Sequence, residues 1–132
     1  MFESTGIIHY GPEIRVILSV DQGITDYYRS LLPKSIRTNP QKHPAHVSVV
    51  RREVPPNMDV WMKHEGEAVV FKYYTDIIND ETYYWLNVEC ERLKEIRVEL
   101  GLKPYPWWRN SYHITIGNVK SADEDEVSQP DA

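Results

Sequence analysis

The sequence is poor in the features that mark secreted and membrane proteins. It has a single cysteine, Cys90, which cannot form an internal disulfide. It has no apolar run of the length that a membrane span needs. Its first residues, MFESTGIIHYG, lack the basic region followed by an apolar run that marks a signal peptide. These absences are typical of proteins in reducing compartments. We therefore expect a cytoplasmic protein with no membrane partner.

The body of the chain also lacks an excess of basic charge. The 132 residues include 20 acids and 15 bases, for a net charge of −5. Residues 121–132, SADEDEVSQPDA, hold five of the acids and no base, so residues 1–120 are neutral. A neutral body disfavours long duplex nucleic acid as a partner, since that calls for a basic stripe. It is compatible with a small anionic ligand. We predict one domain at 1–120 followed by a disordered, dispensable acidic tail.

Several common catalytic signatures are missing as well. The chain has no glycine-rich phosphate loop and no visible Ser-His-Asp arrangement. His43 and His46 have the spacing His-x-x-His, but on a strand that spacing places the two rings on opposite faces. Cys90 is the only thiolate that could join them as a metal ligand. The sequence therefore predicts neither a metal site nor another cofactor.

Apolar periodicity predicts five strands and two helices. Strands are expected at residues 14–20, 45–51, 67–77, 82–88 and 111–117. The third and fourth of these are expected to pair as a long hairpin, with Asn79-Asp80 near its turn. Tyr84, Leu86 and Val88 would share one face of the second arm. The alternation of helices with strands that hairpins can join favours an antiparallel α+β fold.

The two expected helices have recognisable ends. Asp21 is a candidate cap for the first, which Pro33 ends. Its apolar face would hold Ile24, Tyr27, Tyr28, Leu31 and Leu32. The second runs from about Glu89 to Leu100, with Gly101 as its C-cap. Its buried stripe would hold Cys90, Leu93, Ile96 and Leu100. Each half of the chain thus has a helix, a proline-rich loop and a strand, which is a weak duplication.

The strand in each half carries the same short motif, His-x-(Ser/Thr)-apolar. The first copy is HVSV at residues 46–49 and the second is HITI at residues 113–116. Residues i and i+2 of a strand point to the same face, so each motif places an imidazole beside a hydroxyl. The apolar residues between them would face the hydrophobic layer behind. Two such matches among five histidines arise by chance with a probability of roughly 0.3% if positions are independent.

Two imidazoles and two hydroxyls suit cleavage of a phosphodiester. The reaction needs a base to deprotonate the nucleophile and an acid to protonate the leaving oxygen. Imidazole serves both roles because its ordinary pKa lies near neutrality. The hydroxyls of Ser48 and Thr115 can donate to the non-bridging phosphate oxygens, where negative charge builds up. The alternative for His46 and His113 is that both are structural histidines packed within their strands.

The paired motifs resemble those of the 2H phosphoesterase superfamily, which includes the LigT-like RNA phosphoesterases. The resemblance implies two α+β lobes whose antiparallel sheets surround a central cleft, with one motif strand in each lobe. It implies His46 and His113 as catalytic residues, with Ser48 and Thr115 as phosphate-binding groups. The small size and motif placement look like the phage anti-CBASS nucleases, which degrade cyclic oligonucleotide signals of a bacterial immune system. That likeness implies a protein that acts in the cytoplasm of the host cell.

Substrate contacts are expected from aromatic and basic residues near the motifs. Candidates for base stacking are Tyr10, Tyr105, Trp107 and Trp108, although these rings could instead fill the core. Candidates for phosphate contact are Arg52 and Arg109, which could instead be exposed solubilising charges. Three functions stay open at this point: cleavage of a small cyclic nucleotide, processing of short RNA ends that carry a 2′,3′-cyclic phosphate, and nucleotide binding without cleavage.

Overall fold

The computed structural model describes residues 1–106 and 110–119, and seven strands and two α-helices lie within them. The strands are β1 (Phe2–Gly11), β2 (Arg15–Ser19), β3 (His46–Val50), β4 (Ala68–Tyr73), β5 (Ile78–Asn79), β6 (Tyr83–Glu89) and β7 (Tyr112–Asn118). The helices are α1 (Gln22–Ser30) and α2 (Glu91–Glu99), with a short 3₁₀ turn at Met58–Val60.

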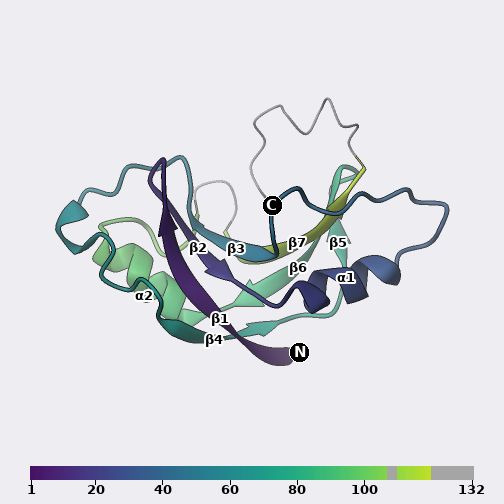
Figure 1. Cartoon of the computed structure of the whole chain (residues 1–132), viewed down its shortest axis with the longest axis horizontal. Helices are drawn as coiled ribbons and strands as arrows, with labels where there is room; N and C mark the ends of the chain where they lie inside the picture. The colour runs from purple at the N-terminus through teal and green to yellow at the C-terminus, as the bar shows by residue number, and fades with distance from the viewer. Residues whose placement is uncertain (107–109, 120–132) are drawn as a thin grey trace.

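Six of the strands close into one antiparallel barrel. Their order is β4-β1-β2-β3-β7-β6, and β6 returns to β4 through the pairs Lys72–Glu89 and Tyr73–Val88. The short β5 pairs with Tyr84 and Trp85, near the start of β6. The expected α+β class and the antiparallel pairing are therefore confirmed. β3 and β7 lie next to each other at the middle of the order, and Figure 1 shows them side by side.

The barrel interior is filled by alternate residues of the strands. Val47 and Val49 of β3 and Ile114 and Ile116 of β7 have no exposed surface. Tyr84, Leu86 and Val88 of β6 belong to the same core, as their alternation predicts. Burying an aliphatic side chain of this size contributes about 1.5–3 kcal/mol. The core therefore holds β3 and β7 firmly from behind and fixes the direction of the residues between them.

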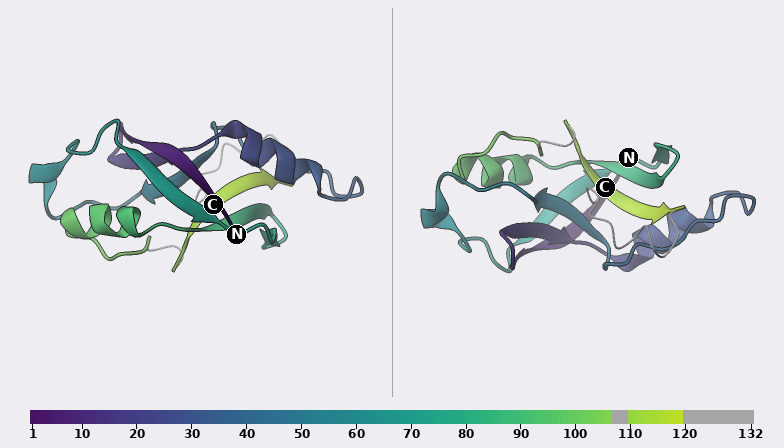
Figure 2. Two further views of the ribbon diagram at one scale, coloured as in Figure 1. Left: turned by 90° about the horizontal axis from the view of Figure 1, so that it is seen from below. Right: turned by 90° about the horizontal axis from the view of Figure 1, so that it is seen from above.

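The two helices lie at opposite ends of the molecule, with the strands between them (Figures 1 and 2). The carboxylate of Asp21 caps α1 by accepting from the backbone N–H of Gly23 at 2.9 Å. α1 packs against β7, the motif strand of the other half. Ile24 and Tyr28 face the core, but Tyr27 and Leu31 are 58% and 56% exposed. Their expected place on the buried face was wrong, because this two-turn helix contacts the barrel along one narrow row.

α2 agrees closely with the pattern predicted for it. Cys90, Leu93, Ile96 and Leu100 are all buried. Gly101 follows the helix with φ of +86°, a left-handed conformation that glycine adopts without strain. A side chain there would also crowd the ring of Pro56. Contacts between α2 and β3 place each helix against the motif strand of the other half.

One fully buried charge, which the periodicity did not predict, joins α2 to the strands. Arg97 uses all five of its N–H donors. They donate to the carbonyl oxygens of Lys103 (2.7 Å), Val49 (2.7 Å) and Tyr105 (3.0 Å) and to both carboxylate oxygens of Glu53 (2.7 and 2.9 Å). Val49 belongs to β3, and residues 103–105 precede β7. Arg97 therefore ties together the chain segments that position both motifs.

Two expectations about the strands need correction. Residues 67–77 and 82–88 do not form a long hairpin, because β4 pairs along its whole length with β1 and meets β6 at only two pairs. The turn at Asn79-Asp80 instead joins β6 to the two-residue β5. The ten-residue β1 was not predicted at all. Its first residues, FEST, lack the apolar alternation that predicts a strand. In the structure β1 pairs with both β2 and β4.

Candidate active site

The two histidine motifs lie on neighbouring strands. β3 and β7 are antiparallel, and Val47 is paired with Ile114. The adjacent positions then place His46 across from Thr115 and Ser48 across from His113. All four side chains point to the face opposite the core, because they alternate with the buried Val and Ile residues. Residues on this diagonal of an antiparallel pair are about 7–8 Å apart, so His46 and His113 are within reach of one phosphate group.

His46 is held by the chain that leads into its own strand. Its Nδ1–H donates to the backbone carbonyl of Pro44 at 2.7 Å. A carbonyl only accepts, so the proton of the neutral ring is on Nδ1 and the lone pair is on Nε2. In the charged ring Nε2 carries a proton that it can donate. With Nδ1 bonded to Pro44, Nε2 is the ring nitrogen through which His46 could exchange a proton with a substrate.

His113 is placed by the neighbouring strand β6. Its ring contacts the indole of Trp85, with centroids 6.1 Å apart. Asn87 is the register partner of His113 across this strand pair. The Trp85 indole N–H donates to the side-chain oxygen of Asn87 at 3.2 Å. Only 3% of His113 is exposed, so its ring is fixed by packing on a rigid element, as catalytic groups require.

The two motif hydroxyls lack protein partners. The oxygens of Ser48 and Thr115 are both buried, and neither has a hydrogen-bond partner among the described residues. A buried polar group without a partner destabilises a fold by about 1–3 kcal/mol. Structures therefore seldom keep such groups, and each one needs an explanation. Two of them lie on one face, each across from an imidazole, where a bound anion could accept from both.

A pocket of about 310 Å³ opens beside His46. We call it the His46-side pocket. Its lining residues are His9, Tyr10, Gly11, Pro12, Arg15, Ile17, Ser19, His43, Pro44, Ala45 and His46. Register pairs Ser19 with His46 and Ile17 with Ser48, so the pocket continues the face that carries the motifs. Arg15 and His43 give it cationic or ionisable groups that the sequence had not marked as site residues.

One wall of the His46-side pocket is organised by Glu65. Its carboxylate accepts from the backbone N–H of Tyr10 at 2.9 Å and pairs with the His9 ring at 2.8 Å. These two contacts, the Tyr10 bond foremost, hold the pKa of Glu65 below its ordinary value. Tyr10 also packs edge-on against Trp61, with ring centroids 4.9 Å apart. Burial raises the pKa of the Tyr10 phenol, so this ring is neutral. The predicted contact residue Tyr10 lines this pocket, but it also belongs to the hydrophobic core, and its register partner Val16 pairs with Val50 rather than with His46.

Arg52 and Tyr105, which were also predicted as contact residues, do not line the His46-side pocket. β3 ends at Val50, so the strand parity that suggested Arg52 does not extend to it. Arg52 is exposed, with a left-handed φ of +58°. Tyr105 contacts Tyr112 and carries the Lys94 ammonium 4.9 Å above its ring. It lines a different pocket, described below. Trp107, Trp108 and Arg109, like the tail at 121–132, lie outside the described residues.

Arg15, Ser19 and His43 were missed as candidates because their places in the His46-side pocket depend on pairing between distant segments. β2 had been predicted, but its outward residues could be assigned to the site only once β3 was known to lie beside it. An outward polar residue at position 19 within an apolar strand was the available signal. His43 had been considered only as a partner of His46 for a metal. The described residues contain no group of three or more His, Cys, Asp or Glu side chains placed to hold a metal ion.

Comparison with known proteins leaves the chain without an assigned family: no protein-family model, curated protein or solved structure matches it. In residues 1–106 and 110–119, neither nine-residue helix approaches the length and apolar character that crossing a membrane demands.

Proposed function

We propose that this protein is a phosphodiesterase in which His46 and His113 act as the general acid and base. The observation that carries the proposal is the group of four side chains on one face of β3 and β7. Two imidazoles lie there with two buried hydroxyls that have no partner among the described residues. A phosphate bound between the imidazoles would supply the missing acceptors. The two halves of the chain, centred on β3 and β7, would correspond to the lobes of a 2H phosphoesterase.

The reaction needs only these groups. One imidazole takes the proton of the nucleophile, which is water or a ribose 2′-hydroxyl, as its oxygen forms a bond to phosphorus. The bond from phosphorus to the leaving ribose oxygen breaks, and the second imidazole gives that oxygen a proton. Ser48 and Thr115 donate to the non-bridging oxygens as charge develops on them. The protonation states of the two histidines are exchanged at the end and are restored through solvent.

We take a cyclic di- or oligonucleotide as the preferred substrate. The neutral body of the chain disfavours a long polyanion. The His46-side pocket has about the volume at which ligand-binding pockets in proteins begin, and it holds Arg15 and His43 for an anionic ligand. Evasion of an immune system that signals with such molecules is the corresponding biological role. The alternatives are cleavage of a 2′,3′-cyclic phosphate at an RNA end and nucleotide binding without turnover.

Single substitutions of the two histidines test the proposal. His46→Ala and His113→Ala should each lower turnover of a cyclic dinucleotide by about 10²–10⁴-fold, since each removes one proton transfer. The double variant should lose less than the product of the two effects. His64→Gln is the matched control, because His64 pairs with Glu67 and Glu99, away from the motif strands. Turnover by the wild-type protein should survive excess EDTA.

Two outcomes would contradict the mechanism. A folded His46→Ala or His113→Ala protein with near-normal turnover would make that histidine structural. Loss of turnover with chelator, restored by one divalent ion, would assign the chemistry to a metal. The substrate is decided by a panel of cyclic dinucleotides and short RNAs that end in a 2′,3′-cyclic phosphate. Binding of a dinucleotide with no product under any condition would favour the non-catalytic alternative.

A further inference from the structure

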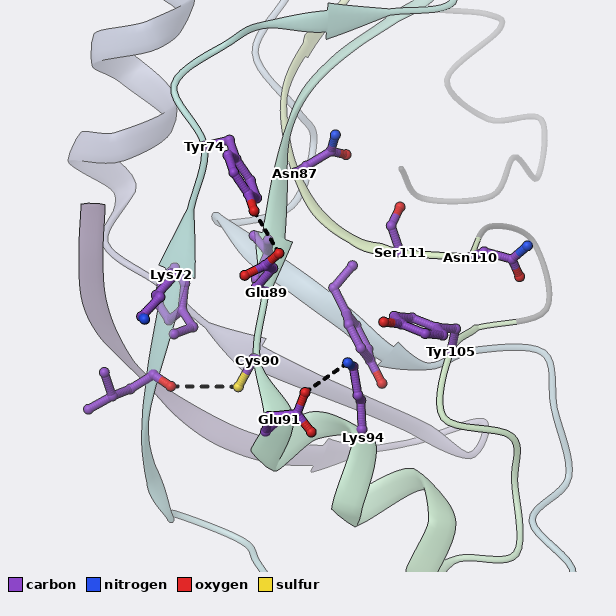
Figure 3. A pocket seen from close by; sticks show the side chains of 14 residues that line it. Lys72, Tyr74, Asn87, Glu89, Cys90, Glu91, Lys94, Tyr105, Asn110 and Ser111 are labelled. Atoms are coloured by element: carbon purple, nitrogen blue, oxygen red, sulfur yellow. Dashed lines mark hydrogen bonds and ion pairs between the residues drawn. The ribbon is translucent and has the colours of Figure 1, made fainter. Parts of the chain in front are cut away.

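A second and larger pocket, of about 530 Å³, lies among β4, β6, the start of α2 and the residues around the start of β7 (Figure 3). We call it the His113-side pocket. Its lining residues come from β4 and the residue after it, from β6, from the start of α2, and from the segment that leads into β7 with its first residue: Val70, Phe71, Lys72, Tyr74, Asn87, Val88, Glu89, Cys90, Glu91, Lys94, Tyr105, Asn110, Ser111 and Tyr112. Asn87 is the register partner of His113, and Ser111 lies two residues before His113. The pocket therefore begins one side chain away from the histidine.

The His46-side pocket includes His46 itself, and the His113-side pocket includes Asn87, the register partner of His113. A phosphodiester carries a substituent on each side of the phosphorus, so a nucleotide substrate has two groups to place. The volume of the His113-side pocket falls within the range of about 300–1,000 Å³ that ligand-binding pockets occupy. A group attached to a phosphate between the histidines would enter it past Asn87.

The charges around the His113-side pocket balance. Lys72 and Lys94 are matched by Glu89 and Glu91, and Lys94 is already paired with Glu91 at 2.9 Å. A pocket for a second phosphate would need a surplus of positive charge to offset the desolvation of that anion. The balance favours a neutral polar group instead. The pocket walls also include apolar surface from Phe71, Val88 and Tyr112, which suits a flat ring.

Glu89 supplies a directional acceptor in the pocket. Its Oε1 accepts from the hydroxyl of Tyr74 at 2.6 Å, and this bond raises the pKa of Tyr74. Among the described residues its Oε2 has no bond. Figure 3 shows Glu89 and Tyr74 turned toward each other on one side of the pocket, with Tyr105 on the other. A carboxylate held in this way accepts from the N–H groups on the edge of a base, as acidic side chains do from base amino groups.

From these contacts, and resting on the proposed function, we infer that the His113-side pocket binds the nucleobase attached on the His113 side of the scissile phosphate. Glu89 Oε2 accepts from the N–H edge of the base, and the apolar wall covers its ring. Guanine, which presents two adjacent N–H donors, fits this arrangement well. The residues of the pocket then decide which nucleotides are bound, while the histidines act on the phosphate that all of them share.

The test measures binding of cyclic di-GMP by titration calorimetry to the wild-type protein and to Glu89→Gln. The substitution keeps the shape and an oxygen for Tyr74 but turns Oε2 into a donor that opposes the base. We expect affinity to fall about tenfold or more, as for loss of a hydrogen bond to a charged group. The control is Asp59→Asn, which removes an exposed carboxylate that lines neither pocket.

Unchanged affinity in folded Glu89→Gln, or no binding by the wild-type protein, would overturn the inference. Turnover of the base-free diester bis(4-nitrophenyl) phosphate by the wild-type protein separates the two proposals. Turnover of this diester with Glu89-independent binding would leave the two-histidine mechanism standing without the base pocket. Glu89-dependent binding without cleavage of any diester would leave the pocket standing and remove the phosphodiesterase.

Discussion

Replacement of Arg97 by methionine should strongly destabilise the fold. Methionine keeps much of the length and the apolar stem of the side chain, but it removes all five donated hydrogen bonds. The carboxylate of Glu53, whose side chain is 13% exposed, would lose its bidentate partner. Removing one member of a buried ion pair costs about 3–5 kcal/mol. The three carbonyl oxygens that Arg97 also satisfies place the expected loss at the upper end of that range.

Thermal unfolding followed by circular dichroism measures this loss. For a chain of this length, a loss of about 3–5 kcal/mol corresponds to a fall in Tm of roughly 10–20 °C. The Tm of Arg97→Lys should lie between those of the wild-type protein and Arg97→Met, because lysine keeps the charge but cannot donate in a planar fork. The double variant Arg97→Met with Glu53→Leu should lose less than the sum of the single losses, since no carboxylate is left unpaired. An Arg97→Met protein with a wild-type Tm would refute the assigned role of Arg97.

Two further predictions concern the motif hydroxyls and acid stability. Thr115→Val and Ser48→Ala should each lower turnover, but by less than the histidine variants. The Tm should stay unchanged or rise, because each substitution removes a buried hydroxyl that has no hydrogen-bond partner among the described residues. A clear fall in Tm would show that the hydroxyl is structural. The Arg92 guanidinium holds the pKa of Glu67 below its ordinary value of 4.5. The stability from this pair is present above that pH and lost as pH falls through the lower folded pKa. Tm should therefore drop below about pH 4.5, and Glu67→Gln should flatten the drop; equal slopes would exclude the pair as its cause.

Local patterns were enough to predict the elements that bury a regular apolar face. The alternation in β6 and the stripe from Cys90 to Leu100 depend only on the spacing of apolar residues, and both are confirmed. Patterns of this kind report which residues turn inward, but they do not report which strand lies beside which. The closure of the barrel is therefore absent from the sequence pattern. It depends on pairs such as Tyr73–Val88, and both strands of such a pair must be placed before it can be recognised.

The candidate site, like the fold, could be predicted only in part from local patterns. The repeated motif identified His46 and His113 and paired each with its hydroxyl on the same strand. It did not predict that β3 and β7 would be neighbours, which places each hydroxyl across from the histidine of the other half. Arg97 shows a second limit, since a buried arginine in an otherwise apolar stripe is indistinguishable in sequence from a charge on the exposed face. Its partners, Glu53 and Tyr105, lie far from one another along the chain.

The antiparallel pairing of β3 and β7 has a chemical consequence that a single motif could not provide. Because Val47 is paired with Ile114, His46 has Thr115 as its cross-strand neighbour and His113 has Ser48. Each imidazole therefore has one hydroxyl along its own strand and another across the strand pair. A phosphate at the centre would meet donors from both halves of the chain, and neither half could bind it alone. The proposed mechanism therefore requires both copies of the motif, and each motif strand is packed against the helix of the other half, β7 against α1 and β3 against α2.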